Sequence, residues 1–444
     1  MRQRSGRTGA TGARLPRIVR LRITVVAAVV GAAALLSHYG VAWLQVTDFQ
    51  ERGSDFSTYY VAALLIREGH ASQLYDQVLE QQRHLALLPP GTRLTLPFVT
   101  PPTTALLALP LSFMDLVAAS RLFSVIEVVL LAAAIVVAVR AAPWPQHLGR
   151  GPRSAVAALA FAGIPTYVLL LLGQLDGICA LGLAGGYAAW RRGSPGWAGF
   201  WLALGFLATK PHLAAGLLLF LLFRREWKAL GGFAAAAGVV VALSLPVVGP
   251  GGLVQFLLGY RYSLGITPEV STLGLPGLVA SWLGTGVAAQ ALEVVSVVAG
   301  LAVCAAFGHR SRRPGASLEF SLLGAVAVSL MLSPHLFSYD LVVMAPLFVV
   351  CMARAAAADR PGVWPGRATL VGVAAWVCGN LLVNADVGNA ASAPPGRVTP
   401  LALLIAAALA WRGLSGGRQP RALRQSAPRR LQFDSGSGVG GSVE

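Results

Sequence analysis

Residues 23–44 read ITVVAAVVGAAALLSHYGVAWL, an unbroken apolar run that follows a strongly basic segment at residues 2–22. The run is too long for the apolar core of a cleaved signal peptide, which spans roughly 7–15 residues, and it matches the length of about 20 residues that a membrane-spanning helix needs. Basic residues beside an apolar span favour the cytoplasmic side of a membrane. The stretch therefore predicts an uncleaved first membrane helix whose N-terminus, residues 1–22, is cytoplasmic.

The rest of the chain has the same apolar character. Of its 444 residues, 55% are hydrophobic and only 12% are charged, whereas about 25% are charged in an ordinary soluble domain. Further apolar runs follow at 118–140, 153–172, 175–190, 197–209, 212–223, 229–248, 286–308, 317–333, 339–356, 368–385 and 399–413. These patterns predict an all-α polytopic membrane protein in which residues 23–413 form about twelve transmembrane helices, with small residues that let the helices approach closely.

Two apolar pieces, residues 101–114 and 273–283, are too short to cross a bilayer alone and contain proline or glycine, so we expect re-entrant or interfacial helices there. With this assignment, 27 of the 35 Lys and Arg residues lie on the predicted cytoplasmic side. The net charge of +17 therefore indicates orientation in a membrane and not binding to nucleic acid. Residues 414–444, rich in Arg, Ser and Gly, predict a disordered cytoplasmic tail.

Residues 47–98 form the one long loop on the opposite, extracytoplasmic side. Asp55 lies in it directly before residues 56–68, which have the pattern of an amphipathic helix ended by Gly69 and are expected to lie along the membrane surface. A carboxylate in this place is either a general base or a cap for the first turn of the helix. Tyr59 is either a surface on which a sugar stacks or an ordinary interfacial aromatic residue.

The topology brings other polar residues to the same membrane face, at the ends of different helices: Gln174, Asp176, Lys210, His212, Arg261, His335, Tyr339 and Asp340. Lys210 is the most informative of these because it interrupts an apolar hairpin, where a lysine needs an anion. That anion is either a bound phosphate or a salt-bridged carboxylate of Asp176 or Asp340. His335 is likewise either a phosphate ligand or a hydrogen-bonded structural histidine.

Two acidic residues, Glu127 and Glu293, lie inside apolar spans. They indicate either a proton pathway or hydrogen bonds to neighbouring helices, and the lack of Lys or His at a similar depth favours the hydrogen bonds. The four cysteines all fall in apolar stretches and are expected to be buried. The sequence contains no phosphate-binding glycine loop and no zinc-protease or serine-hydrolase motif, so we expect neither a metal nor a cofactor.

The chain contains an ordered set of motifs: Asp55-Phe56 with Tyr59-Tyr60, then Pro101-Pro102, Gly173-Gln174, Lys210-Pro211 and Ser333-Pro334-His335 with Tyr339-Asp340. This set resembles the motifs of glycosyltransferase family 87. The resemblance covers about residues 20–410 and implies a GT-C fold in the plasma membrane. It further implies transfer of a hexose, most often mannose, from a polyprenyl-phosphate donor to a glycolipid or cell-wall glycan outside the cytoplasm. The sequence departs from the family pattern after Gln174 and at residues 267–275. These departures concern the identity of the acceptor.

The resemblance implies that Asp55 is the general base of an inverting reaction. We expect Lys210, His212, Arg261 and His335 to stabilise the donor phosphate, and Tyr59, Gln174, Asp176, Tyr339 and Asp340 to surround the sugar or the acceptor. The alternative class is a secondary transporter or flippase for lipid-linked sugars, which should have inverted repeats and a site near the middle of the membrane. Because the polar residues gather at one membrane face, the pattern favours the enzyme over the transporter.

Overall fold

The computed structural model describes residues 17–88, 96–266, 271–284, 286–359, 364–388 and 396–415. All regular elements within these ranges are helices, which confirms the predicted all-α class. Of the predicted disordered tail, only residues 414 and 415 are described, at the end of a helix, and the other residues of the tail lie outside the described ranges. Residues 1–16 of the predicted basic segment lie outside them as well.

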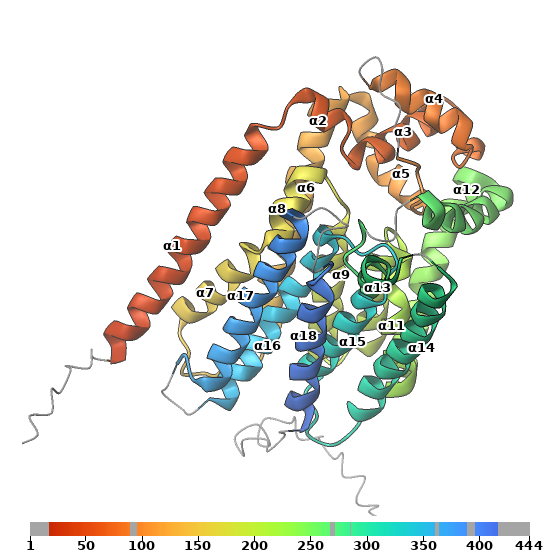
Figure 1. Ribbon diagram of the computed structural model, residues 1–444. Coiled ribbons are helices and arrows are strands. Elements are labelled where there is room, and N and C mark those ends of the chain that lie inside the picture. Colours follow the sequence, from red (N-terminus) through yellow and green to blue (C-terminus); the bar gives the residue numbers. More distant parts are fainter. Residues whose placement is uncertain are drawn as a thin grey trace, which may run out of the picture.

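Each predicted apolar run is helical. The corresponding elements are α1 (Arg17–Leu44), α6 (Leu116–Ala141), α7 (Arg150–Phe161) with α8 (Ile164–Leu172), α9 (Asp176–Arg191), α10 (Pro195–Leu207), α11 (Ala215–Arg224), α12 (Trp227–Ile266), α14 (Val287–Arg310), α15 (Leu318–Met331), α16 (Met344–Ala358), α17 (Arg367–Gly388) and α18 (Thr399–Ser415). Figure 1 shows them as a bundle, with α1 along one side, where it packs against α7. The start of α1 and the end of α18 lie at the same end of the bundle.

The number of helices long enough to span a membrane is smaller than the predicted number of transmembrane helices. Within the described ranges, six helices are long and apolar enough to cross a membrane, or seven if α7 and α8, bent by 51°, form one span. Five other apolar helices have only 10–17 residues, fewer than the roughly 20 that a straight span requires. The multi-pass architecture is confirmed, but the predicted count of twelve spans is not.

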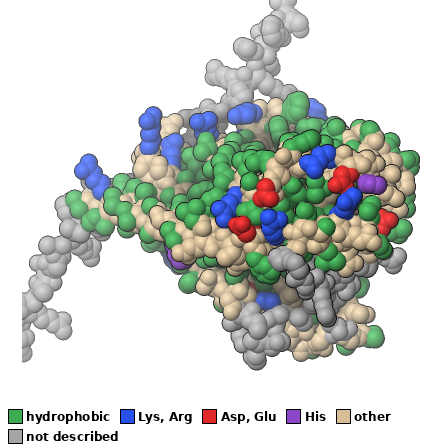
Figure 2. Space-filling view, turned by 90° about the horizontal axis from the view of Figure 1, so that it is seen from above, with side chains coloured by type: hydrophobic (Ala, Val, Ile, Leu, Met, Phe, Trp, Pro, Cys, Tyr) green, Lys and Arg blue, Asp and Glu red, His purple; other side chains and the backbone are tan. Residues whose placement is uncertain are grey.

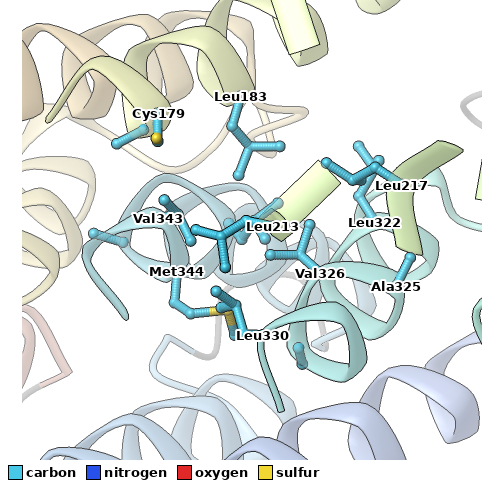
Figure 3. Packing of buried hydrophobic residues seen from close by; sticks show 14 of the residues in the cluster. Cys179, Leu183, Leu213, Leu217, Leu322, Ala325, Val326, Leu330, Val343 and Met344 are labelled. Carbon is cyan, nitrogen blue, oxygen red and sulfur yellow. The ribbon is translucent and has the colours of Figure 1, made fainter. Parts of the chain in front are cut away.

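Close packing of α9, α10 and α12 depends on glycine. A Cβ atom on Gly182 would lie 2.7 Å from the Cα atom of Gly205, and a Cβ on Gly199 would lie 1.8 Å from the carbonyl oxygen of Ala229. Neither site has room for a larger side chain, which agrees with the expected role of small residues between membrane helices. Elsewhere in the core, Figure 3 shows Leu183, Leu213 and Val326 converging from different elements.

The loop at residues 47–98 folds into a helical cap over one end of the bundle (Figure 1). Its described elements are α2 (Asp48–Arg52), α3 (Phe56–Arg67), η1 (Ala71–Gln73) and α4 (Gln77–Leu87), and the neighbouring short pieces are α5 (Pro102–Ala108), η2 (Leu109–Phe113) and, from the other predicted short run, α13 (Leu275–Leu283). Helix α3 ends before Gly69, whose φ is +83°, as predicted.

The predicted amphipathic character of this helix is wrong, whereas its position at the membrane surface stays a prediction. All ten residues from Phe56 to Leu65 are buried, because α3 packs against α4, α5, α6 and η2 on its different sides. One cysteine also differs from its prediction. Cys179, Cys304 and Cys351 are buried, whereas Cys378 on α17 is exposed, because α17 contacts its neighbours α16 and α18 and leaves much of its surface uncovered.

Basic residues lie at the opposite end of the bundle. Arg191, in the last turn of α9, lies 4.0 Å from Glu319 at the start of α15. Arg224, at the end of α11, donates a hydrogen bond of 3.0 Å to the carbonyl oxygen of Ser311. The end of α9 therefore meets the start of α15, and the end of α11 meets the loop between α14 and α15. Both contacts lie far along these helices from the polar residues at their other ends.

Candidate active site

Asp55 immediately precedes α3, but its side chain does not cap that helix. The carboxylate instead accepts a hydrogen bond from the side-chain amide of Gln174. The amide oxygen of Gln174 accepts in turn from the Tyr59 hydroxyl at 2.9 Å. Gln174 thus links Asp55 to the first turn of α3 and fixes the direction of the carboxylate, which remains only half-buried. The helix-cap explanation of Asp55 is not supported.

Gly173 places Gln174 in this position. It ends α8 in the left-handed conformation, with φ of 62° and ψ of 58°, which glycine adopts without a steric penalty. A Cβ atom at Gly173 would lie 3.1 Å from the Cβ of Phe56 and 3.3 Å from the Ser124 hydroxyl. The absence of a side chain lets the turn between α8 and α9 approach α3, and this approach brings Gln174 to Asp55.

Lys210 lies between α10 and η3 (Pro211–Ala214) in a buried salt-bridge cluster. Its ammonium group is 2.7 Å from Oδ2 of Asp176 and 2.6 Å from Oδ1 of Asp340, and 4.3 Å from the centre of the Tyr339 ring. The second oxygen of Asp340 accepts from the backbone amide of Phe337 at 2.6 Å. The structure therefore contains the salt bridges that the sequence offered as one alternative, and binding of phosphate by Lys210 stays a prediction.

The two histidines of the predicted site are neighbours. The rings of His212 and His335 are 6.3 Å apart between centroids and nearly perpendicular. Burial lowers the pKa of His335, against the opposing effect of Asp340, and this favours the neutral form of the ring near neutral pH. Arg261 lies in α12, but its side chain is outside the part of the chain that the structure describes.

The surroundings of Asp55 favour its protonated form more than water does. Burial raises the pKa of Asp55 above its ordinary value, and hydrogen bonds from Gln174 and Tyr339 and the charge of Lys210 oppose this effect only in part. Burial also raises the pKa of Tyr59, so this hydroxyl keeps its proton and remains the donor to Gln174. A carboxylate with a raised pKa is suited to accept a proton from a hydroxyl group.

Glu127 has a structural hydrogen bond, as the favoured sequence interpretation predicts. It is fully buried in α6, and its Oε2 atom accepts from the backbone amide of Ile178 at 3.3 Å. Gly177 permits this contact, because a Cβ there would lie 2.2 Å from the carbonyl oxygen of Glu127. Glu293 lies apart from this site, beside α13, where it lines a small void with Pro276.

A second polar group, close to Asp55 in the chain, was not predicted from the sequence. The Ser57 hydroxyl lies 2.7 Å from Nε2 of His84, and Glu80, one turn earlier on α4, accepts from the backbone amide of Phe98 at 2.7 Å. Burial raises the pKa of Glu80 to about 8. The spacing of four residues between Glu80 and His84, which puts both on one helix face, was the available signal. The contact between Ser57 and His84 holds α4 against α3, and the contact of Glu80 holds the segment at Phe98 against α4.

Together these residues form a polar site at one end of an apolar helical bundle. Figure 2, seen from above this end, shows acidic, basic and histidine side chains close together on a surface of hydrophobic and other residues. Among the described residues, the site joins the start of α3, the turn before α9, the hairpin around Lys210 and η5 (Ser338–Val343). A polytopic membrane protein with such a site has the architecture of an enzyme that acts at a membrane face.

The sequence model of glycosyltransferase family 87 matches residues 98–334, just over half of the chain. The chain belongs to this family and is a membrane glycosyltransferase. The matched range contains Gln174, Asp176, Lys210 and His212, whereas Asp55 precedes it. His335, Tyr339 and Asp340 follow it. No curated protein and no solved structure compared with the chain matches it.

Proposed function

We propose that this glycosyltransferase transfers a hexose, with mannose as the first candidate, from a polyprenyl-phosphate donor to a hydroxyl of a glycolipid or cell-wall glycan. The observation that carries the proposal is the partly exposed Asp55. Gln174 holds one oxygen of its carboxylate, and the residue lies beside the cluster of Lys210, Asp176 and Asp340. Gln174 and Tyr339 position the carboxylate from within the protein, and the partial exposure of Asp55 lets an acceptor hydroxyl approach it. This is the arrangement that a general base requires.

In the proposed reaction, Asp55 accepts the proton of the acceptor hydroxyl as its oxygen attacks the anomeric carbon of the sugar. The bond between that carbon and the phosphate oxygen breaks, and its electron pair leaves with the polyprenyl phosphate. The new bond forms on the opposite face of the sugar, so the configuration at the anomeric carbon is inverted. Negative charge develops on the leaving phosphate, where hydrogen-bond donors and cations lower the barrier.

The salt bridges alter the roles that we propose for individual residues. Lys210 already faces two carboxylates, so its main effect is to hold the ends of α9, the Lys210 hairpin and η5 together. Contacts to the donor phosphate then fall mainly to His212, His335 and Arg261. Tyr59 and Gln174 hold Asp55, and Tyr339, whose ring lies over Lys210, is the proposed sugar contact near the base.

The nature of the donor follows from the face on which the site lies. Nucleotide sugars are made in the cytoplasm, whereas the basic loops of this chain predict that the Asp55 end of the bundle faces away from it. A sugar donor available at that face has to be carried through the membrane on a lipid. The plasma membrane, with both termini cytoplasmic, is therefore the proposed location.

Cysteine labelling in intact cells tests this orientation. Val78, 66% exposed on α4, and Lys228, exposed at the start of α12, are replaced singly by cysteine in a chain carrying Cys378→Ser, which removes the exposed cysteine of the described residues. An impermeant maleimide is expected to label Val78→Cys in intact cells and Lys228→Cys only after permeabilisation. The reverse pattern would place Asp55 in the cytoplasm and remove the argument for a lipid-linked donor.

A further inference from the structure

A large apolar cavity lies between α15, α16, α17 and α18, apart from the Asp55 site. Its volume is about 1050 Å³, at the upper end of the range of roughly 300–1,000 Å³ found for small-molecule sites. Phe348, Met352, Trp376 and Leu403 are among its lining residues. Val371 and Cys378 also line it and are exposed, so the cavity is continuous with the outer surface of the bundle.

One end of the cavity is basic. Arg354, half-buried on α16, and Arg367, at the start of α17, both line it. The salt bridges found in the described part of the chain include neither residue. The one carboxylate in the lining, Asp359, accepts hydrogen bonds from the backbone amides of Gly366, Ala368 and Thr369. Asp359 therefore caps α17. Its carboxylate is occupied by these backbone amides, so the lining has two arginine charges and one carboxylate that already has partners.

This combination selects the kind of ligand. An apolar cavity of this size does not hold stable water, because its walls offer few hydrogen bonds, and in a membrane it is filled by a hydrocarbon chain. A basic pocket between membrane helices at the cytoplasmic end is suited to the phosphate of an anionic lipid. The occupant that fits both parts has an apolar chain and a negatively charged head group.

We propose that an anionic phospholipid binds here, with an acyl chain in the cavity and its phosphate at Arg354 and Arg367. The site lies at the end of the bundle opposite Asp55, so this inference goes beyond the transfer reaction and does not depend on it. The bound lipid would fill the space between α16 and α17 and join two helices whose packing is otherwise incomplete.

Photo-crosslinking of the purified protein tests the proposal. The probe is phosphatidylglycerol with a diazirine on its acyl chain, and the crosslinked peptides are mapped by mass spectrometry. We expect crosslinks in the cavity-lining parts of α16, α17 and α18. The double variant Arg354→Gln with Arg367→Gln should bind the probe about 30-fold more weakly, equivalent to about 2 kcal/mol, because each basic residue near an anionic head group contributes about 1 kcal/mol.

Two further variants separate the cavity from nonspecific attraction. Arg192→Gln removes an exposed charge outside the cavity lining and should leave crosslinking unchanged. Ala375→Phe narrows the cavity without altering charge and should reduce crosslinking, which shows that the acyl chain enters it. Equal labelling by a phosphatidylcholine probe, or undiminished labelling in the arginine variant, would overturn the proposal. Displacement by polyprenyl phosphate with no effect of the arginine changes would assign the cavity to a substrate chain instead.

Discussion

Asp55→Asn is expected to lower the turnover of sugar transfer by about 100-fold or more, which is the scale of the contribution of a general base. Asparagine has nearly the same shape, and its amide oxygen can still accept the hydrogen bond from Gln174. It cannot take a proton from the acceptor. The change also removes a charge from a half-buried place, so thermal stability should not fall. Initial rates and thermal unfolding of the purified protein measure the two effects.

Asp48→Asn is the matched control. Asp48 belongs to the same cap and is exposed, so its replacement should leave turnover unchanged. Asp55→Glu, which restores a carboxylate one methylene further out, should recover part of the activity. An Asp55→Asn variant with full turnover would show that another group accepts the proton.

The same carboxylate should determine how activity depends on pH. A general base acts only when deprotonated, so turnover is present above its pKa and falls as the pH decreases through it. Because burial raises the pKa of Asp55, the loss of activity should occur at a higher pH than the ordinary aspartate value of about 3.9 predicts. A pH profile of kcat/KM locates this loss, which Asp55→Glu should shift.

Lys210→Met is expected to destabilise the folded protein, by about 3–5 kcal/mol on the scale of broken buried ion pairs. Methionine keeps the apolar stem but leaves the carboxylates of Asp176 and Asp340 buried without their cation. Thermal unfolding in detergent should therefore occur at a lower temperature. Adding Asp176→Asn should restore part of the loss, because one unpaired charge is then removed.

Lys228→Met is the control for this experiment, since Lys228 is the one other lysine in the chain and is exposed. It should leave the unfolding temperature unchanged. The sequence alone suggested a phosphate ligand at Lys210. If Lys210→Met stays as stable as the wild type but binds polyprenyl phosphate more weakly, that suggestion is correct and the structural role is secondary.

The helices were predictable from sequence because a bilayer requires each crossing segment to satisfy its own backbone hydrogen bonds. Long apolar runs such as α6 and α14 therefore gave their positions directly. The shorter helices α10 and α11 leave the count of spans undetermined, since their lengths fall below that of a straight crossing. The burial of α3 was not predictable, because elements outside its own loop, among them η2 and α6, help to cover it.

For the candidate site, the sequence predicted which described residues lie near one another better than it predicted their contacts. Asp55, Gln174 and Lys210 were each placed at one face by topology, and the structure brings their surroundings together. Whether the anion beside Lys210 is a phosphate or a carboxylate depended on the position of Asp340, which is 130 residues away in the chain. No local pattern gives such a distance. The link from Tyr59 through Gln174 to Asp55 required the turn at Gly173 to be known.

The most direct measurement uses purified protein in liposomes with candidate lipid acceptors. One sample receives radiolabelled mannose carried on polyprenyl phosphate, and a parallel sample receives radiolabelled mannose carried on a nucleotide. Product analysis by thin-layer chromatography then identifies the donor that is used. We predict a labelled product from the polyprenyl-phosphate donor with the wild-type protein and almost none with Asp55→Asn. Transfer from the nucleotide donor alone, or equal transfer by wild type and Asp55→Asn, would contradict the proposed function.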